Sequence, residues 1–305
     1  MCTPSATTDG SCPTSDKVRS RISPQWALVA LTVAATASLG PAQAHAAGDV
    51  DTAALQVALK ARGFYSGTID GIAEPATAAG VRAVERRAGL AVDGIAGPSV
   101  RRTLGRHALG SRVLRVGRVG WDVSALQFRL AWRGFPSGTF DGAFGAHLQA
   151  AVRFYQQFAG LAPDGVAGPS TLRSLRDHAI PRSPIRLMRP VPAPVGDGFG
   201  PRGARFHTGV DLLAGYGTVV RAAGTGVVSF AGSLDGYGEL VVVQHVLGVS
   251  TYYAHLSRIL TRQGARIVAG QTLGRVGTTG DATGPHLHFE VRLRGAAVDP
   301  RGAIG

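Results

Sequence analysis

An internal duplication constrains this 305-residue chain more than any other feature of its sequence. When the sequence is shifted by 71 residues, residues 51–104 align with residues 122–175 without a gap, and 28 of the 54 aligned positions are identical. A tandem duplication accounts for so regular a match, so the two segments are expected to fold into two copies of one small unit. Each copy has about 55 residues, near the lower size limit for a domain that folds alone.

Each repeat has the sequence pattern of three short helices joined by glycine-containing turns. The first helical stretch carries apolar residues at helical spacing, such as Leu55 and Leu59, and ends at Arg-Gly-Phe, where the glycine is a helix-stop signal. Asp-Gly pairs form turns, and the proline of Ala-Gly-Pro-Ser stands at the start of the third helix. The pattern predicts two all-α domains, at residues 47–105 and 120–178.

This order of elements resembles the peptidoglycan-binding domain that occurs in tandem beside many cell-wall hydrolases. The resemblance covers the whole of each repeat and rests on its Gln, Asp-Gly and Asp-Gly-x-x-Gly-Pro pattern. It implies that peptidoglycan is the partner of the repeats. The first repeat departs from the pattern, with Gly80 inside a helix, where glycine costs up to about 1 kcal/mol, and Glu85 in place of a glutamine. We therefore expect it to be less stable and to bind more weakly.

The first 46 residues have the pattern of a secretory signal peptide. Arg19 and Arg21 precede an apolar run of 14 residues that ends at Leu39, and an Ala-x-Ala pattern follows. The run is shorter than the roughly 20 residues of a membrane-spanning helix, and an uncleaved anchoring segment is the alternative. Cleavage after Ala44 or Ala46 would remove both cysteines, which excludes disulfides and a cysteine nucleophile from the mature chain.

The chain is strongly basic, with a formal net charge of +13 that comes almost entirely from arginine. Such a charge favours polyanionic partners. Export argues against nucleic acid and favours anionic cell-wall polymers. We expect a secreted, cell-wall-associated protein with no stable membrane insertion after signal cleavage.

Two segments have the composition of linkers. Residues 106–119 are short, basic and rich in glycine, and are expected to join the repeats. Residues 179–197 carry five of the 17 prolines and predict a semi-rigid spacer. A new composition begins after this spacer, which indicates a separate domain at residues 198–305.

In this last domain, helical periodicity gives way to short runs of β-branched residues between glycines, a pattern typical of strands. The runs are residues 218–222, 226–230, 240–245, 250–253, 271–276 and 287–293. The predicted fold is therefore multidomain, with two small three-helix all-α repeats followed by an all-β domain. Five of the nine histidines lie in the all-β part, which points to metal or catalytic chemistry: His207, His245, His255, His286 and His288.

The spacing of these histidines suits a metal site. On a strand, His286, His288 and Glu290 would share one face, while the residues between them would enter the core. His207 and Asp211 add an imidazole and a carboxylate. Catalytic zinc takes three protein ligands, so the set leaves a histidine over for proton transfer. From spacing alone, unrelated surface histidines are an equal alternative.

Four sequence blocks follow one another in the C-terminal part: Phe199-Gly200-Pro201-Arg202, His207-x-Gly209-x-Asp211-Leu212, Tyr253-Ala254-His255-Leu256 and Gly277-x-Thr279-Gly280-x-x-x-Gly284-Pro285-His286-Leu287-His288-Phe289-Glu290. These blocks, in this order, resemble the lysostaphin-type (LytM-like) zinc metallopeptidases over about residues 190–300. The resemblance implies that His207, Asp211 and His288 bind Zn²⁺, and that His255 and His286 are metal-free catalytic histidines.

The remaining candidates are expected to be structural. Glu290 lies in the motif, but nothing in the resemblance makes it a general base. His245 stands outside the motifs and is expected to be structural or at the surface. Four further histidines are expected at the surface: His45, His107, His147 and His178.

Together these features predict a secreted peptidoglycan hydrolase, a zinc-dependent endopeptidase that cuts cell-wall peptide stems or cross-bridges. The alternative is a catalytically silent LytM-like activator of cell-wall amidases, because some members of that family have lost metal ligands. A purely wall-binding protein would leave the C-terminal histidines without a role.

Overall fold

The computed structural model describes residues 48–105 and 109–304 of the chain, which belong to one compact unit. The predicted signal segment, His45 and His107 lie outside the described residues. Among the helices that are described, none combines the length and the apolar character needed to cross a membrane.

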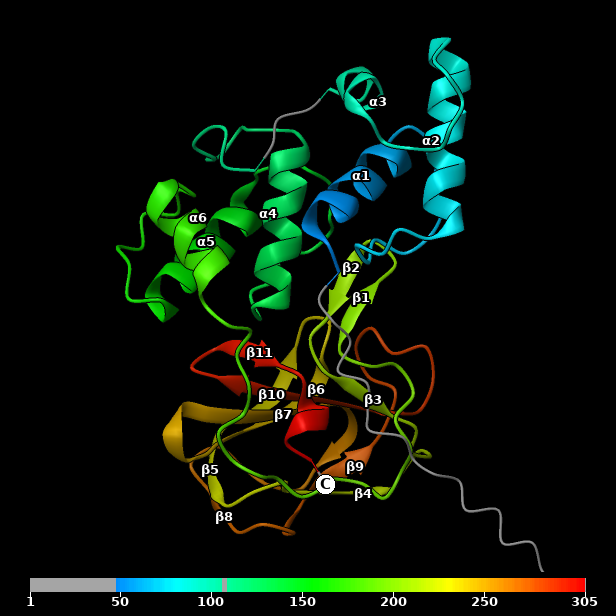
Figure 1. The fold of residues 1–305 in the computed structure, drawn as a ribbon. Coiled ribbons are helices and arrows are strands. Elements are labelled where there is room, and N and C mark those ends of the chain that lie inside the picture. Colours follow the sequence, from blue (N-terminus) through cyan, green and yellow to red (C-terminus); the bar gives the residue numbers. More distant parts are fainter. Residues whose placement is uncertain (1–47, 106–108, 305) are drawn as a thin grey trace, which may run out of the picture. The chain divides into compact units, whose positions relative to one another are not determined.

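The helical part contains the two predicted three-helix repeats, which confirms the all-α assignment (Figure 1). The first helices of the two repeats pack against each other. Repeat 1 comprises α1 (Val50–Lys60), α2 (Pro75–Ala88) and α3 (Pro98–Thr103), and repeat 2 comprises α4 (Trp121–Trp132), α5 (Ala146–Phe158) and α6 (Pro169–Asp177).

A buried glutamine on the first helix of each repeat holds the first Asp-Gly turn. In repeat 2, the Gln127 amide donates to Asp141 Oδ1 over 2.8 Å and accepts from the Gly142 N–H over 2.9 Å. In repeat 1, Gln56 makes the same contact with Asp70 over 2.8 Å. The aspartates thus stabilise turns, as expected for most Asp-Gly pairs.

The second Asp-Gly turn differs between the repeats. Gln156 donates to Asp164 Oδ1 over 2.7 Å and accepts from the Gly165 N–H over 2.9 Å. Glu85 stands at the equivalent position of repeat 1 and accepts from the Gly94 N–H over 2.9 Å. An ionised carboxylate has no proton to donate, so it cannot make the bond that Gln156 makes to its aspartate.

Gly80 has a packing role that offsets its expected cost. A Cβ added at this position of α2 would lie 2.7 Å from the carbonyl oxygen of Phe64. The absence of a side chain therefore lets the α1–α2 connection approach the helix closely.

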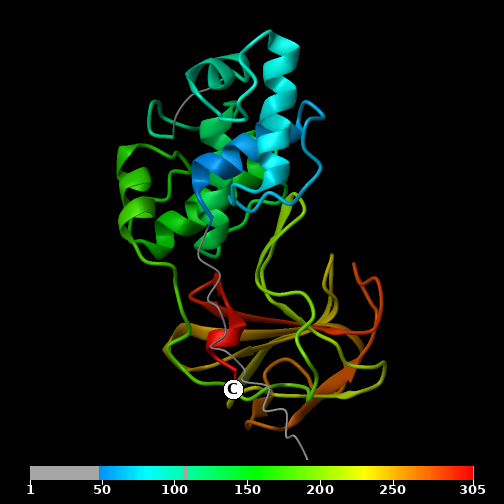
Figure 2. The same ribbon diagram turned by 45° about the vertical axis from the view of Figure 1, so that its right-hand side comes forward.

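The C-terminal part is a β domain, which confirms the predicted fold class. Antiparallel strands form its main sheet in the order β11-β10-β7-β6-β5-β8, with β3 on β10 and β9 on both β4 and β7. Figures 1 and 2 show this sheet from two directions. The strands are β1 (Gly200–Arg202), β2 (Arg205–His207), β3 (Val210–Leu212), β4 (Val219–Arg221), β5 (Gly226–Leu234), β6 (Gly238–Gln244), β7 (Val249–Ile259), β8 (Arg266–Ile267), β9 (Thr272–Val276), β10 (Leu287–Leu293) and β11 (Ala296–Val298).

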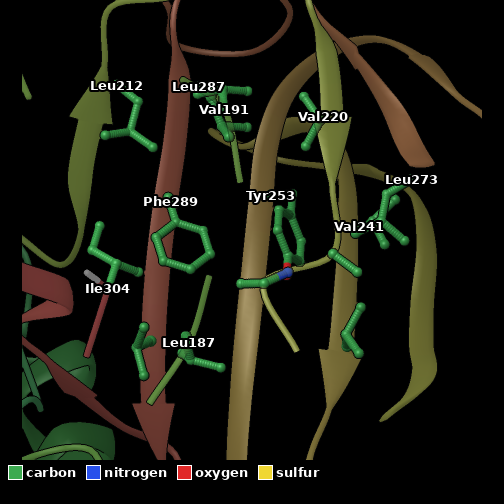
Figure 3. Packing of buried hydrophobic residues seen from close by; sticks show 14 of the residues in the cluster. Leu187, Val191, Leu212, Val220, Val241, Tyr253, Leu273, Leu287, Phe289 and Ile304 are labelled. Atoms are coloured by element: carbon green, nitrogen blue, oxygen red, sulfur yellow. The ribbon is translucent and has the colours of Figure 1, made fainter. Parts of the chain in front are cut away.

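The core of the β domain includes part of the segment that was expected to be a spacer. Leu187 and Val191 are buried in the same cluster as Tyr253 and Phe289 (Figure 3). The Leu187 N–H also donates to the carbonyl of Ala303 over 2.9 Å. The semi-rigid spacer that the proline-rich composition predicted at residues 179–197 is therefore too long, because Leu187 and Val191 are part of the hydrophobic core.

The β1–β2 hairpin makes matching contacts with both repeats. The N–H groups of Ile69 and Phe140 donate to the carbonyls of Gly203 and Ala204 over 2.8 and 2.7 Å. Ile69 and Phe140 are 71 residues apart, so they occupy equivalent positions in the duplication. The hairpin that ends in His207 therefore accepts a hydrogen bond from the backbone N–H of the equivalent residue in each repeat.

We expect Glu85→Gln to stabilise the protein, because the new amide can donate to Asp93 as Gln156 donates to Asp164. The gain should be about 1 kcal/mol, the size of a typical buried hydrogen bond. Differential scanning calorimetry of the full chain measures it, and Gln156→Glu is the matched control that should lower the unfolding temperature. A fall in unfolding temperature with Glu85→Gln would contradict this account of the difference between the repeats.

Candidate metal centre

Three buried side chains bring their ligand atoms together in the β domain. His207 Nε2 lies 2.9 Å from His288 Nδ1 and 3.1 Å from Asp211 Oδ1, and His288 Nδ1 lies 3.0 Å from the same oxygen. Among the described residues, this is the group of histidine and acidic side chains whose geometry could hold a metal ion.

Strand register places two members of this group. Asp211 on β3 lies directly opposite His288 on the antiparallel strand β10. Gly209, between His207 and Asp211, permits this pairing, because a Cβ there would lie 2.4 Å from the carbonyl oxygen of Phe289. The glycine of the His-x-Gly-x-Asp motif is therefore required by the close approach of two strands.

The outer nitrogen of each histidine faces an acceptor. His207 Nδ1 lies 2.8 Å from the carbonyl oxygen of Gly198, and His288 Nε2 lies 3.0 Å from Glu290 Oε1. Both outer nitrogens must therefore carry a proton. Once the two rings are neutral, as metal binding requires, the unprotonated nitrogens are the two that face Asp211.

The spacing of the three atoms fits zinc. With zinc–ligand distances of about 2.0–2.1 Å, neighbouring ligands of a tetrahedral ion are roughly 3.3 Å apart. The observed separations of 2.9–3.1 Å are close to this value. Two imidazoles and one carboxylate also form a ligand set of the catalytic zinc type, which leaves one position open.

The charges in the group depend on one another. Burial alone would raise the pKa of Asp211, but hydrogen bonds with His207 and His288 hold it well below its usual value. Burial alone would lower the pKa of His288, but Asp211 and Glu290 raise it to about 9. A metal ion that binds here near neutral pH therefore has to displace the proton on Nδ1 of His288.

Two further histidines face the same group. The ring centroid of His255 lies 4.8 Å from that of His286 and 5.7 Å from that of His288. His286 Nε2 lies 3.7 Å from Asp211 Oδ1. Their Nδ1 atoms face backbone carbonyls, of Thr279 over 2.8 Å for His255 and of Gly284 over 2.9 Å for His286.

The backbone at His255 is unusual, with a φ of +59° that L-amino acids rarely adopt. Residues 254 and 255 of β7 lie opposite a single residue of β6, which is the pattern of a β-bulge. The bulge turns the imidazole toward the metal-ligand group. Burial lowers the pKa of His255, so the ring is neutral at pH 7 and its Nε2 can accept a proton.

The group lies at one side of a cleft of about 850 Å³. Arg202, Arg205 and Tyr237 also line this cleft. Arg202 lies 3.4 Å from the second oxygen of Asp211 and 3.2 Å from Asp197. Asp197, Asp211 and Asp281 line the same cleft, so carboxylates balance its two guanidinium groups.

The structure brings all five residues singled out from the sequence to this cleft: His207, Asp211, His255, His286 and His288. His245 is buried between Thr225 and Thr251 and does not line the cleft, while His147 and His178 are exposed. Sequence reasoning did not identify Tyr237, Thr208 and Arg292, which contact Glu290. Tyr237 stands outside the four motif blocks, so no spacing pattern could have indicated it.

Two protein-family models match the chain, one in the β domain and one in each helical repeat. A family model for "Peptidase family M23" matches residues 205–300, and one for "Putative peptidoglycan binding domain" matches residues 49–104 and 120–175.

Curated relatives match about a third of the chain. The DD-carboxypeptidase/endopeptidase Mpg of Neisseria meningitidis is 49% identical over 96 residues, which cover 32% of this chain and 22% of Mpg. The peptidoglycan DD-endopeptidase ShyC of Vibrio cholerae is 38% identical over 130 residues, or 40% of this chain and 29% of ShyC. The match thus spans less than a third of either relative. A solved zinc-containing peptidase from Vibrio cholerae is 32% identical, with a TM-score of 0.35 and coverage of 38% of this chain and 39% of that one.

We expect His255→Gly to be more stable than His255→Ala by roughly 1 kcal/mol, because only glycine adopts a positive φ without steric cost. Both changes remove the imidazole, so their difference isolates the backbone term, and urea unfolding measures it. Thr251, on the same strand with an ordinary φ, is the control: there the glycine variant should be the less stable one. If the glycine variant were less stable than the alanine variant at both positions, the backbone at His255 would not be strained.

Proposed function

We propose that this chain is a secreted, zinc-dependent endopeptidase of peptidoglycan, because residues 205–300 match the model of peptidase family M23 and residues 49–104 and 120–175 match that of a peptidoglycan-binding domain. Its substrates would be peptide stems or cross-bridges of the cell wall. The names of Mpg and ShyC, both of which include endopeptidase activity, support this class of reaction.

The observation that carries the proposal is the convergence of His207, Asp211 and His288 beside two further histidines. The ligand atoms are 2.9–3.1 Å apart, and each histidine in the set is oriented by an acceptor on its far side. A silent activator would not need this arrangement, so the intact set favours an enzyme over the amidase-activator alternative.

Three of the five residues would bind zinc, and the other two would transfer protons. Zinc held by His207, Asp211 and His288 would supply Lewis acidity toward the scissile carbonyl and a water molecule of lowered pKa. His255 is neutral at pH 7, so we assign it the acceptance of the proton from the attacking water. His286 would donate to the developing oxyanion or to the leaving amine.

The remaining parts of the chain would bring this site to its substrate. Arg205 in the cleft suits a carboxylate group of a peptide stem. Two wall-binding repeats on the same chain raise the effective concentration of the catalytic domain at an insoluble polymer. The signal-peptide pattern of residues 1–46 supports export.

Replacement of the two histidines of His286-Leu287-His288 should have unequal effects. His288→Ala should lower both bound zinc and activity, because three protein ligands are the minimum for an open zinc site. His286→Ala should keep near-stoichiometric zinc and lose about 10²- to 10⁴-fold in turnover, the usual contribution of proton transfer. Elemental analysis, together with mass spectrometry of the muropeptides released from purified peptidoglycan, measures both effects.

Equal loss of zinc in the two variants would overturn the ligand assignment. A wild-type protein that holds zinc and releases no peptide, yet stimulates a separate amidase, would favour the activator alternative instead.

Wall binding should depend on the repeats. A full-length His286→Ala protein should co-sediment with insoluble peptidoglycan at physiological salt, whereas a chain that begins at residue 181 should stay in the supernatant. The shortened chain keeps Leu187, which belongs to the β-domain core. Binding that is lost between low and physiological salt would indicate charge attraction alone. Equal sedimentation of both chains would contradict a targeting role for the repeats.

A further inference from the structure

Glu290 is a fully buried carboxylate two residues after His288 on β10. A buried charge is costly unless it is paired and hydrogen-bonded, so its surroundings should account for it. Arg292 provides the opposite charge, with its Nε 2.7 Å from Glu290 Oε2. The guanidinium also lies over the ring of Tyr252, 4.4 Å from the centroid, and is thereby held in place.

The other carboxylate oxygen accepts from three groups on different parts of the domain. Tyr237 donates its hydroxyl proton to Glu290 Oε1 over 2.9 Å, Thr208 donates its own to the same oxygen, and His288 Nε2 lies 3.0 Å away. Arg292 in turn donates to the Tyr237 hydroxyl over 2.9 Å, which directs the hydroxyl proton toward Glu290. The carboxylate thus has donors on both oxygens.

We propose that Glu290 is a positioning residue for the metal centre: it keeps the remaining proton of His288 on Nε2, so that Nδ1 offers its lone pair to the metal. An ionised carboxylate can only accept, so the nitrogen that faces it must be a donor. His288 Nδ1 is the atom that lies 2.9 Å from His207 Nε2 and 3.0 Å from Asp211 Oδ1. Carboxylates behind metal-bound histidines act in this way, and their removal typically lowers metal affinity about 10- to 100-fold.

Only a carboxylate satisfies all the donors around Glu290. A glutamine at this position would have to turn its NH₂ group either toward the Arg292 Nε or toward the cluster of Tyr237, Thr208 and His288. Either orientation places two donors against each other. Glu290→Gln is therefore nearly isosteric but leaves one side of the network unsatisfied.

The inference rests on the proposed zinc site, and its test measures zinc rather than peptide release. In the full chain, Glu290→Gln should raise the zinc dissociation constant about 10- to 100-fold, as measured by competition with a chelator of known affinity. Glu239→Gln is the control: Glu239 lies on β6 of the same domain and is not among the described residues that hydrogen-bond to His288, so the zinc affinity of this variant should equal that of the wild type.

A second variant separates positioning from simple stability. Glu290→Gln combined with Arg292→Met removes the donor that conflicts with the amide, so the double variant should recover unfolding temperature. Its zinc affinity should remain low, because the charged acceptor behind His288 is still missing. Nitrogen NMR of the zinc-loaded protein should also show the Nε2 proton of His288 in the wild type and its weaker protection from exchange in both variants.

The outcomes are distinct. Zinc affinity that stays at the wild-type level in Glu290→Gln, or that recovers with the unfolding temperature in the double variant, would overturn the positioning role and leave the zinc site intact. A wild-type chain that does not bind zinc would overturn the proposed function, and this inference with it.

Discussion

The pairing of Asp211 with His288 across β3 and β10 is the contact on which the site depends. It places a carboxylate oxygen 3.0 Å from an imidazole nitrogen and requires the close strand approach that Gly209 permits. If one strand slipped by one residue in this pairing, its side chain would turn to the opposite face of the sheet from its partner. The buried apolar residues on either side of His288 oppose such a slip, because it would expose them to water.

The histidine rings of the site are oriented by hydrogen-bond acceptors, and most of these acceptors are backbone carbonyl oxygens. Carbonyl groups orient His207, His255 and His286, whereas a carboxylate orients His288. Backbone acceptors do not depend on side-chain identity, so the orientation of these three rings tolerates substitution in the loops around them. His288 is the exception, since its orientation depends on the identity of Glu290.

Sequence patterns predicted the elements with strong periodicity and missed those set by long-range contacts. The 71-residue repeat gave both three-helix units, and alternation along residues 287–293 correctly placed Leu287 and Phe289 in the core. The short strands β1, β2, β3, β8 and β11 were not predicted, because each has only two or three residues. β3 and β8 also depend on partners distant in the sequence, β10 and β5. Likewise, Tyr237 joins the site through the fold and not through any motif.

Residues that precede the M23 family match pack into the β domain. They therefore decide which segment must be transferred when this domain is joined to another protein. The M23 match begins at residue 205, but Leu187 and Val191 fill the core beneath the sheet, and the carbonyl of Gly198 orients His207. A chimaera that joined residues 205–300 to another wall-binding module would lack these groups. Domain exchange should therefore use a junction before residue 187, so that the β domain carries its own proline-rich segment with it.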